Sequence, residues 1–189
     1  PVVTRVVEPD RLSKVYDFIR TEVSSGRQVI VVYPLVEESE KLDLAAAVEA
    51  YKELSKIQFN GLELGLLHGK MKSIEKKNML NKFERNEISI LVSTTVIEVG
   101  IDSPNATVML IDHAERFGLS QLHQLRGRVG RGSKRSYCIL VRRKTTETSR
   151  DRLAIMEKTS DGFKIADEDL NLRGPGEFIG ERQSGFLSY

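Results

Sequence analysis

The segment at 121–132, QLHQLRGRVGRG, combines an amide with guanidinium groups at a regular spacing. On a helix capped by Ser120, the side chains of Gln124, Arg128 and Arg131 stand at positions i, i+4 and i+7 and share one face. Guanidinium groups offer rigid, paired donors that match the oxygens of a phosphate group. We therefore expect these three side chains to bind an anionic ligand.

The same predicted helix, running to Gly130, also carries an apolar stripe. Leu122, Leu125 and Val129 lie together on it and can bury against a sheet. A solvated basic helix without a site is the alternative interpretation. The three glycines within 127–132 argue against it, because glycine is a poor residue for a helix surface and permits a close approach of the backbone instead.

A second segment, TTVIEVGID at 94–102, follows a predicted strand. Ligands of open α/β sheets bind at the carboxyl ends of the strands, so a loop that starts at Thr94 is well placed for binding. The Thr94 hydroxyl can donate to a phosphate group, and Asp102, after a turn at Gly100, can accept from a ribose hydroxyl. The alternatives are that Thr94 caps a helix and that Asp102 only caps the turn.

The elements that must position these groups follow from the apolar pattern. Five short apolar runs predict strands, at Val29–Tyr33, Leu62–Leu67, Ile88–Ser93, Thr107–Asp112 and Ser136–Arg142. Runs such as VIVVY are apolar on both faces, which is typical of a parallel sheet covered on two sides. Helical patterns start at Asp10, after Pro34 and at Ser73. Alternating strands and helices predict an α/β fold with a doubly wound parallel sheet.

The pattern changes after about residue 145. Residues 1–145 are predicted to form the α/β domain, and 146–189 to form a helical hairpin, broken near Ser160–Gly162, followed by a glycine-rich loop. A flexible linker is the alternative for this last stretch. Phe178 and Ile179 lie among its glycines, together with charged residues, and favour an ordered loop.

Composition sets further limits. The net charge is only +2, yet the stretch 118–146 contains no Asp or Glu and eight Lys or Arg residues, a local basic field that favours polyanions. The single cysteine, Cys138, lies in an apolar run and is expected to be buried, and we predict no metal site. No signal peptide and no apolar stretch near 18 residues is present, which predicts a soluble, cytoplasmic protein. A start at Pro1 without a methionine suggests a fragment of a longer chain.

The two segments resemble motifs V and VI of the superfamily 2 helicases and translocases, and 28–39, QVIVVYPLVEES, resembles motif IV. LHGKM at 67–71 matches the segment that precedes a DNA-contacting helix in these enzymes, although capping or core packing is the more common role of a histidine such as His68. The resemblance implies a RecA-like lobe. The resemblance implies that Thr94 contacts the nucleic-acid backbone and that Gly100 and Asp102 lie near the ATP ribose. It also implies that the catalytic residues are Gln124, Arg128 and Arg131. In the family, these arginines reach the γ-phosphate and stabilise the charge that develops in phosphoryl transfer.

A closer resemblance is to the RecG family of branched-DNA helicases. It is carried by HAERFGLSQLHQLRGRVGRG at 113–132 and by DLNLRGPGEFIGERQSG at 169–185, which resembles a translocation element shared with the transcription-repair coupling factor. The tetrad GPGE favours RecG. The resemblance implies that Arg152, Arg173 and Gln183 couple nucleotide state to DNA movement, in an enzyme that remodels stalled forks and Holliday junctions in recombination and repair.

Two motifs are missing from the chain. It contains no GxxxxGK[ST] phosphate loop, since GKMKS at 69–73 lacks the leading glycine, and no DExH or DEAD motif for Mg²⁺. We therefore expect half an ATPase site that is inactive by itself, with ATP and Mg²⁺ held mainly by another motor lobe of the same polypeptide. We also expect this polypeptide to contain a wedge domain for the DNA branch. The alternatives are a lobe of a coupling factor and a nucleic-acid-binding domain that never hydrolyses ATP.

Overall fold

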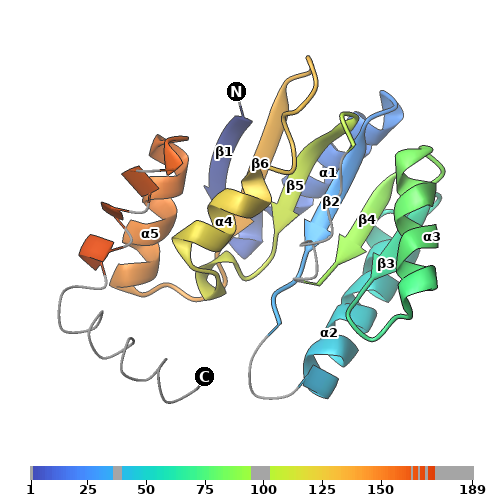
Figure 1. Cartoon of the computed structure of the whole chain (residues 1–189), viewed down its shortest axis with the longest axis horizontal. Helices are drawn as coiled ribbons and strands as arrows, with labels where there is room; N and C mark the ends of the chain where they lie inside the picture. Colours follow the sequence, from blue (N-terminus) through green and yellow to red (C-terminus); the bar gives the residue numbers. More distant parts are fainter. Residues whose placement is uncertain are drawn as a thin grey trace.

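The fold is built around one parallel sheet. The computed structural model describes residues 2–35, 40–94, 103–162, 164–165, 167–168 and 170–172. Six strands pair in the order β1-β6-β5-β2-β4-β3, and every pairing is parallel (Figure 1). Their bounds are β1 Val2–Val7, β2 Gln28–Val32, β3 Leu64–Leu67, β4 Ile90–Ser93, β5 Ala106–Ile111 and β6 Ser136–Val141. The predicted doubly wound α/β fold is confirmed.

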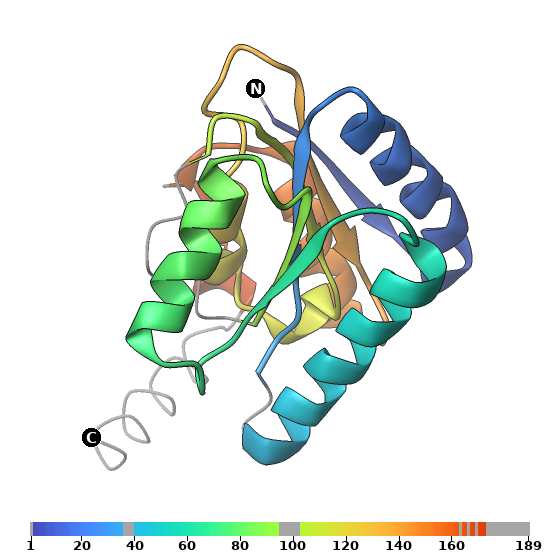
Figure 2. The same cartoon turned by 90° about the vertical axis from the view of Figure 1, so that its right-hand side faces the viewer.

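Helices cover both faces of this sheet. Their bounds are α1 Leu12–Ser24, α2 Glu40–Glu53, α3 Ser73–Glu84, α4 Leu119–Arg126 and α5 Glu147–Lys158. A π-helical turn, Leu54–Gln58, continues α2, and 3-10 turns lie at Pro9–Arg11 and Ala114–Arg116. Figure 2 shows α1 and α2 on one side of the sheet and α3 on the other.

The alternation of side chains along β2 explains the two-sided core. Val29 and Val31 pack with Ile19 of α1 on one face, whereas Ile30 and Val32 belong to the cluster under α3, α4 and α5. Successive side chains of a strand point to opposite faces, so an unbroken apolar run fills two cores at once. Every residue of β2 is buried as a result.

The last helices pack on the same face as α4. Leu153 and Met156 of α5 are fully buried in the cluster that also contains Leu122 of α4. After Thr159, the described residues between 162 and 172 are again helical, and Ile165 is buried in the same cluster. The break falls where the sequence indicated it, near Ser160–Gly162, whereas a domain boundary at residue 145 stays a prediction.

Three local expectations were wrong. The strand β1 was not predicted, and it pairs with β6 at the edge of the sheet, more than 130 positions away in the chain. Asp10 is not the amino-terminal cap of α1, because a 3-10 turn precedes the helix and Arg11 occupies the cap position. Ser73 is the first residue of α3, and Lys72 precedes it as the cap. Neighbouring turns thus displaced both helix starts by one or two positions.

A buried glutamine joins the sheet to two loops at the amino ends of the strands. The Gln28 side-chain amide donates to the carbonyl oxygens of Phe83, at 2.6 Å, and Ile88, at 2.8 Å. Its side-chain oxygen accepts from the Ser103 hydroxyl and the Asn105 amide. Only 1% of Gln28 is exposed, so water cannot take the place of its side chain as the hydrogen-bond partner of these groups.

We predict that Gln28→Met destabilises the chain by about 2–4 kcal/mol, because similar volume is kept while two buried carbonyl oxygens lose their donor. Urea unfolding followed by circular dichroism measures the change. Asn78→Met, on the exposed side of α3, is the matched control and should shift the unfolding free energy little. Equal effects of the two substitutions would contradict a structural role for the Gln28 amide.

Candidate functional site

The loop at 127–135, called the arginine loop below because it carries Arg128 and Arg131, leads into β6 at the amino edge of the sheet. Because all six strands are parallel, the segments after β2, β4, β5 and β6 emerge at the opposite, carboxyl edge. Gly100 and Asp102, predicted to bind nucleotide, lie outside the described residues, as do Arg173 and Gln183, predicted to act in coupling. Thr94, Gln124, Arg128, Arg131 and Arg152 are the predicted site residues that the structure describes.

Thr94 follows β4 directly. It is 1% exposed, its backbone N–H donates to the Leu67 carbonyl oxygen at 3.1 Å, and its own carbonyl accepts from the Ser93 hydroxyl. Its hydroxyl oxygen is buried, without a hydrogen-bond partner in the described part of the chain. The predicted position at the sheet's carboxyl edge is therefore observed, but the hydroxyl faces inward in this conformation.

The predicted helix from Ser120 to Gly130 is wrong at both ends. Gly118 is the amino-terminal cap of α4, and its N–H donates to the Gln121 side-chain oxygen at 3.0 Å. The helix ends at Arg126, since the backbone turns away at Gly127 and Gly130 has a positive φ of 81°.

Because α4 ends at Arg126, the three residues predicted to bind phosphate do not lie on one helix. Gln124 is exposed on α4, whereas Arg128 and Arg131 lie in the loop that follows, so no shared i, i+4, i+7 face exists. Arg128 is half-buried, and exposed Arg131 donates from Nε to the Gly127 carbonyl oxygen at 3.2 Å. The structure still places all three within one short segment, with their side chains accessible to a ligand.

The apolar stripe and the close approach of the glycines are both observed. Leu122, Leu125 and Val129 are buried against the sheet. A Cβ atom on Gly130 would lie 2.6 Å from Val2 Cγ2, and one on Gly132 would lie 2.8 Å from the Pro104 carbonyl oxygen. The glycines therefore let the arginine loop pack closely against β1 and against the residues that follow 95–102.

Arg126 was missed as an individual residue by the sequence analysis. It is 5% exposed and donates to the Thr4 hydroxyl at 3.2 Å and to the carbonyl oxygens of Met156, at 2.7 Å, and Thr159, at 2.9 Å. Burial lowers the pKa of its guanidinium group. Arg126 lies beside Leu122 and Leu125 on the apolar stripe of α4, and this position in the sequence could have indicated that it is buried.

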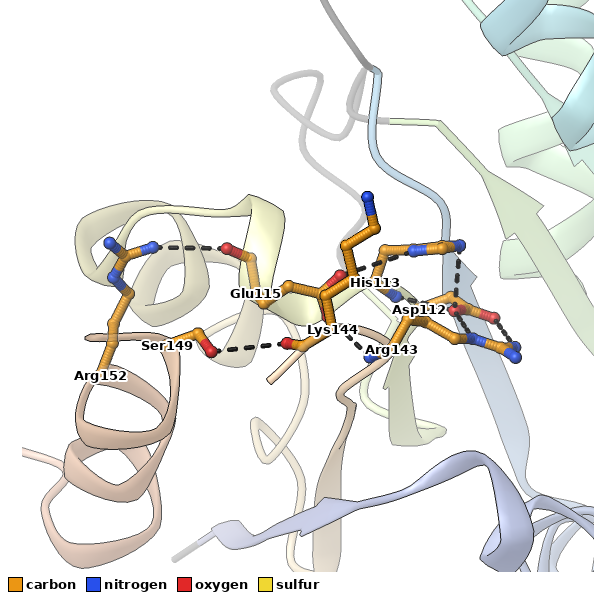
Figure 3. Close-up of polar contacts among 7 residues, drawn as sticks. All are labelled: Asp112, His113, Glu115, Arg143, Lys144, Ser149 and Arg152. Atoms are coloured by element: carbon orange, nitrogen blue, oxygen red, sulfur yellow. Dashed lines mark hydrogen bonds and ion pairs between the residues drawn. The ribbon is translucent and has the colours of Figure 1, made fainter. Parts of the chain in front are cut away.

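Arg152 extends from α5 to the turn before α4. Its Nη1 donates to the Glu115 carbonyl oxygen at 3.4 Å (Figure 3) and to the Phe117 carbonyl oxygen at 3.3 Å. These carbonyls belong to the turn at Ala114–Arg116 and its cap, two residues before the helix starts. A residue predicted to act in coupling thus contacts the segment that positions Gln124, Arg128 and Arg131.

The other side of the same turn is held by an ion pair between Arg143, at the surface, and the buried carboxylate of Asp112. Arg143 Nε and Nη2 each lie 2.9 Å from one carboxylate oxygen of Asp112, which is 4% exposed, and hydrogen bonding to this carboxylate raises the pKa of Arg143 (Figure 3). The Arg143 N–H donates to Glu115 Oε1, and the His113 N–H donates to Asp112 Oδ1. His113 itself has a left-handed backbone, with φ of 48°. The pair joins the carboxyl ends of β5 and β6.

A cavity of about 570 Å³ opens beside this ion pair, on the α1 and α2 face of the sheet. Tyr16, Tyr33, Asp112 and Arg143 contribute to its lining. Burial, followed by the charge of Asp112, raises the pKa of both phenols, so they remain protonated donors. The cavity lies on the opposite face from α4 and is separate from the arginine loop.

Two absences concern only the part of the chain that the structure describes. There, no group of three His, Cys, Asp or Glu side chains could hold a metal ion. Among the same residues, no helix has both the length and the apolar character needed to span a membrane.

Comparisons with known proteins bear on this geometry. A family profile described as the helicase conserved C-terminal domain matches residues 10–133. The chain is 56% identical over 189 residues to the ATP-dependent DNA helicase RecG of Synechocystis, and 50% identical over 183 residues to that of Bacillus subtilis. These matches cover 100% and 97% of the chain but 23% and 27% of the relatives, so the chain spans about a quarter of their length.

Solved structures agree. A RecG bound to a three-way DNA junction is similar over 93% of this chain and 23% of that one, with a TM-score of 0.78 and 50% identity. Domain 2 of the DEAD-box helicase Mss116p, bound to an RNA duplex, matches over 84% of this chain and 61% of that one, with a TM-score of 0.65 and 17% identity. The second similarity concerns the fold alone.

We predict that His113 makes the stability of the chain sensitive to acid. Burial lowers its pKa below 6.5, with the charge of Asp112 opposing. The unfolded chain therefore binds a proton near pH 6.5 that the folded chain accepts only at lower pH, and stability is lost as the pH falls through this window. His113→Asn keeps a residue that tolerates the left-handed backbone but removes the proton-binding group. Unfolding free energies at pH 7.5 and 5.5 should show a smaller loss for the variant, and an equal loss would exclude His113 as the cause.

Proposed function

The chain belongs to the family of helicase conserved C-terminal domains, and on that premise we propose that it is the C-terminal motor lobe of a RecG-type ATP-dependent DNA helicase. The observation that carries the proposal is the extent of the similarity. The family profile ends at residue 133, whereas similarity to RecG proteins continues through α5 to the end of the chain at 48–56% identity. A generic helicase lobe accounts for the first part only.

In this proposal the arginine loop completes an ATPase site between two lobes. Arg128 and Arg131 lie in the loop between α4 and β6, which follows exposed Gln124 of α4 and packs near the amino ends of β1 and β6. Guanidinium groups can stabilise charge on the γ-phosphate of an ATP bound by the other motor lobe, which would supply the phosphate loop and the Mg²⁺ ligands that this sequence lacks. Gly100 and Asp102 would contact the ribose of the same nucleotide.

DNA contacts are proposed in the arginine loop, at the amino edge of the sheet, and at Thr94 on the carboxyl edge. Lys134 and Arg135 are exposed at the end of this loop, within the stretch that contains no acidic residue, and can bind phosphates of the DNA backbone. Thr94 would contact DNA only after a rearrangement that exposes its buried hydroxyl. The substrate would be branched DNA, such as stalled forks and Holliday junctions, in keeping with the relative bound to a three-way junction.

Coupling of hydrolysis to DNA movement is proposed to run through α5. Arg152 contacts the turn that precedes α4, so a shift of the arginine loop on nucleotide binding can be transmitted to α5. Arg173 and Gln183 follow this helical region in the chain, and we propose that they act in the same coupling at the DNA.

We expect Arg131→Ala in the full-length protein to reduce ATP turnover by about 10³-fold, with ATP affinity and folding largely kept, because Arg131 is an exposed residue outside the buried core. Arg131→Lys should recover little activity, since an ammonium lacks the planar pair of donors. Phosphate release at saturating DNA measures the effect. Arg11→Ala, on the exposed surface before α1, is the control. Turnover of Arg131→Ala near that of the wild type would refute the arginine assignment.

The isolated 189-residue chain should hydrolyse no ATP, with or without DNA, because it contains neither a phosphate loop nor a Mg²⁺ motif. Phosphate release by the purified chain tests this against a mixture to which the other motor lobe has been added. DNA-stimulated turnover by the isolated chain would contradict a half-site. Absence of turnover in the full-length protein would instead favour a binding domain that never hydrolyses ATP.

A further inference from the structure

Helix α4 contacts the end of α5 through a face that the nucleotide proposal does not use. His123 and Arg126 stand three positions apart on α4, so they share one side of the helix, whereas Gln124 is exposed. Both side chains reach the region in which α5 ends and the next helical stretch begins. Figure 1 shows α4 and α5 side by side on one face of the sheet.

Arg126 closes the carboxyl end of α5. The carbonyl oxygens of Met156 and Thr159 lie in and just beyond the last turn of this helix, where backbone acceptors lack partners within the helix. A guanidinium group satisfies both acceptors and places a positive charge at the negative end of the helix dipole. The same group donates to Thr4 of β1, so three elements meet at one buried side chain.

His123 packs against the turn that follows. A Cβ atom on Gly162 would lie 2.9 Å from His123 Nε2 and 3.5 Å from two ring carbons, so a methyl group there would force the imidazole to move. His123 Nδ1 is buried without a hydrogen-bond partner among the described residues. A residue without a side chain is therefore needed at position 162 for this contact.

We propose that His123, Arg126 and Gly162 form a joint that makes the end of α5 and the turn at 159–162 follow the movements of α4. The joint rests on the proposed function and adds positioning residues to it. Arg152 attaches α5 to the turn before α4, near the middle of α5, and the joint attaches its far end. Two attachment points along a helix fix its orientation, whereas one alone leaves a pivot. With both in place, α4, α5 and the following segment move as one body.

The joint is tested in the full-length protein with Gly162→Ala, by measuring ATP turnover and fork unwinding on the same sample. We expect DNA-stimulated turnover to stay within about twofold of the wild type, while base pairs unwound per ATP fall about 5-fold or more, the size of a typical coupling between sites. Ser160→Ala, at an exposed position two residues away, should leave both quantities unchanged.

A second substitution separates a steric joint from general damage. His123→Ala removes the ring that the added methyl group would meet, so the double variant His123→Ala with Gly162→Ala should recover unwinding per ATP relative to Gly162→Ala alone. Should Gly162→Ala not fold, Arg126→Lys replaces it, because lysine keeps the charge but cannot reach both carbonyl oxygens through one planar group, and it should show the same loss of unwinding per ATP.

The outcomes are distinguishable. Wild-type unwinding per ATP in both Gly162→Ala and Arg126→Lys would overturn the joint and leave the proposed function intact. Equal loss of turnover and unwinding, or no recovery in the double variant, would also overturn it, because the contact would then serve only folding or the nucleotide site. A wild-type protein without DNA-stimulated ATP hydrolysis would refute the proposed function and the joint together.

Discussion

A parallel sheet requires a crossover between each pair of neighbouring strands, and this constraint organises the whole chain. Crossover helices must cover both faces, so the central strands are mostly apolar and all residues of β2, β4 and β5 are buried. The same constraint brings the carboxyl ends of all six strands to one edge. Thr94, the Asp112–Arg143 pair and the segment leading to α4 lie along this edge for this reason, although they are distant in sequence.

Within this frame, basic residues close together in sequence have different environments. Arg126 is buried and satisfied by a hydroxyl and two carbonyls, and Arg143 is paired with a buried carboxylate. Arg131, only five positions after Arg126, is exposed. A charged group removed from water requires partners of this kind, whereas the proposed ATP-site residue Arg131 lies at the surface. Part of the basic stretch is thus structural.

The segment 113–132 connects these two roles. Its first turn is held from one side by Arg143 and from the other by Arg152. Its helix is tied to the end of α5 by Arg126, and its final loop packs against β1 and Pro104 through glycines. Each of these attachments links the arginine loop to a different element. In the proposed function, a change in the arginine loop would reach the C-terminal helices through these direct contacts.

The sequence by itself determined the fold class, five of the six strands to within two residues, the break between the C-terminal helices and the family, because apolar periodicity and motif spacing are local patterns. Only the tertiary structure decided where α4 ends, since the chain after Gly127 packs so closely on Val2 and Pro104 that a side chain at Gly130 or Gly132 would collide with them. The pairing of β1 with β6 and the burial of Arg126 against α5 likewise depend on residues far away in the chain. No local pattern encodes such partners, because chain topology and packing select them when the sheet assembles.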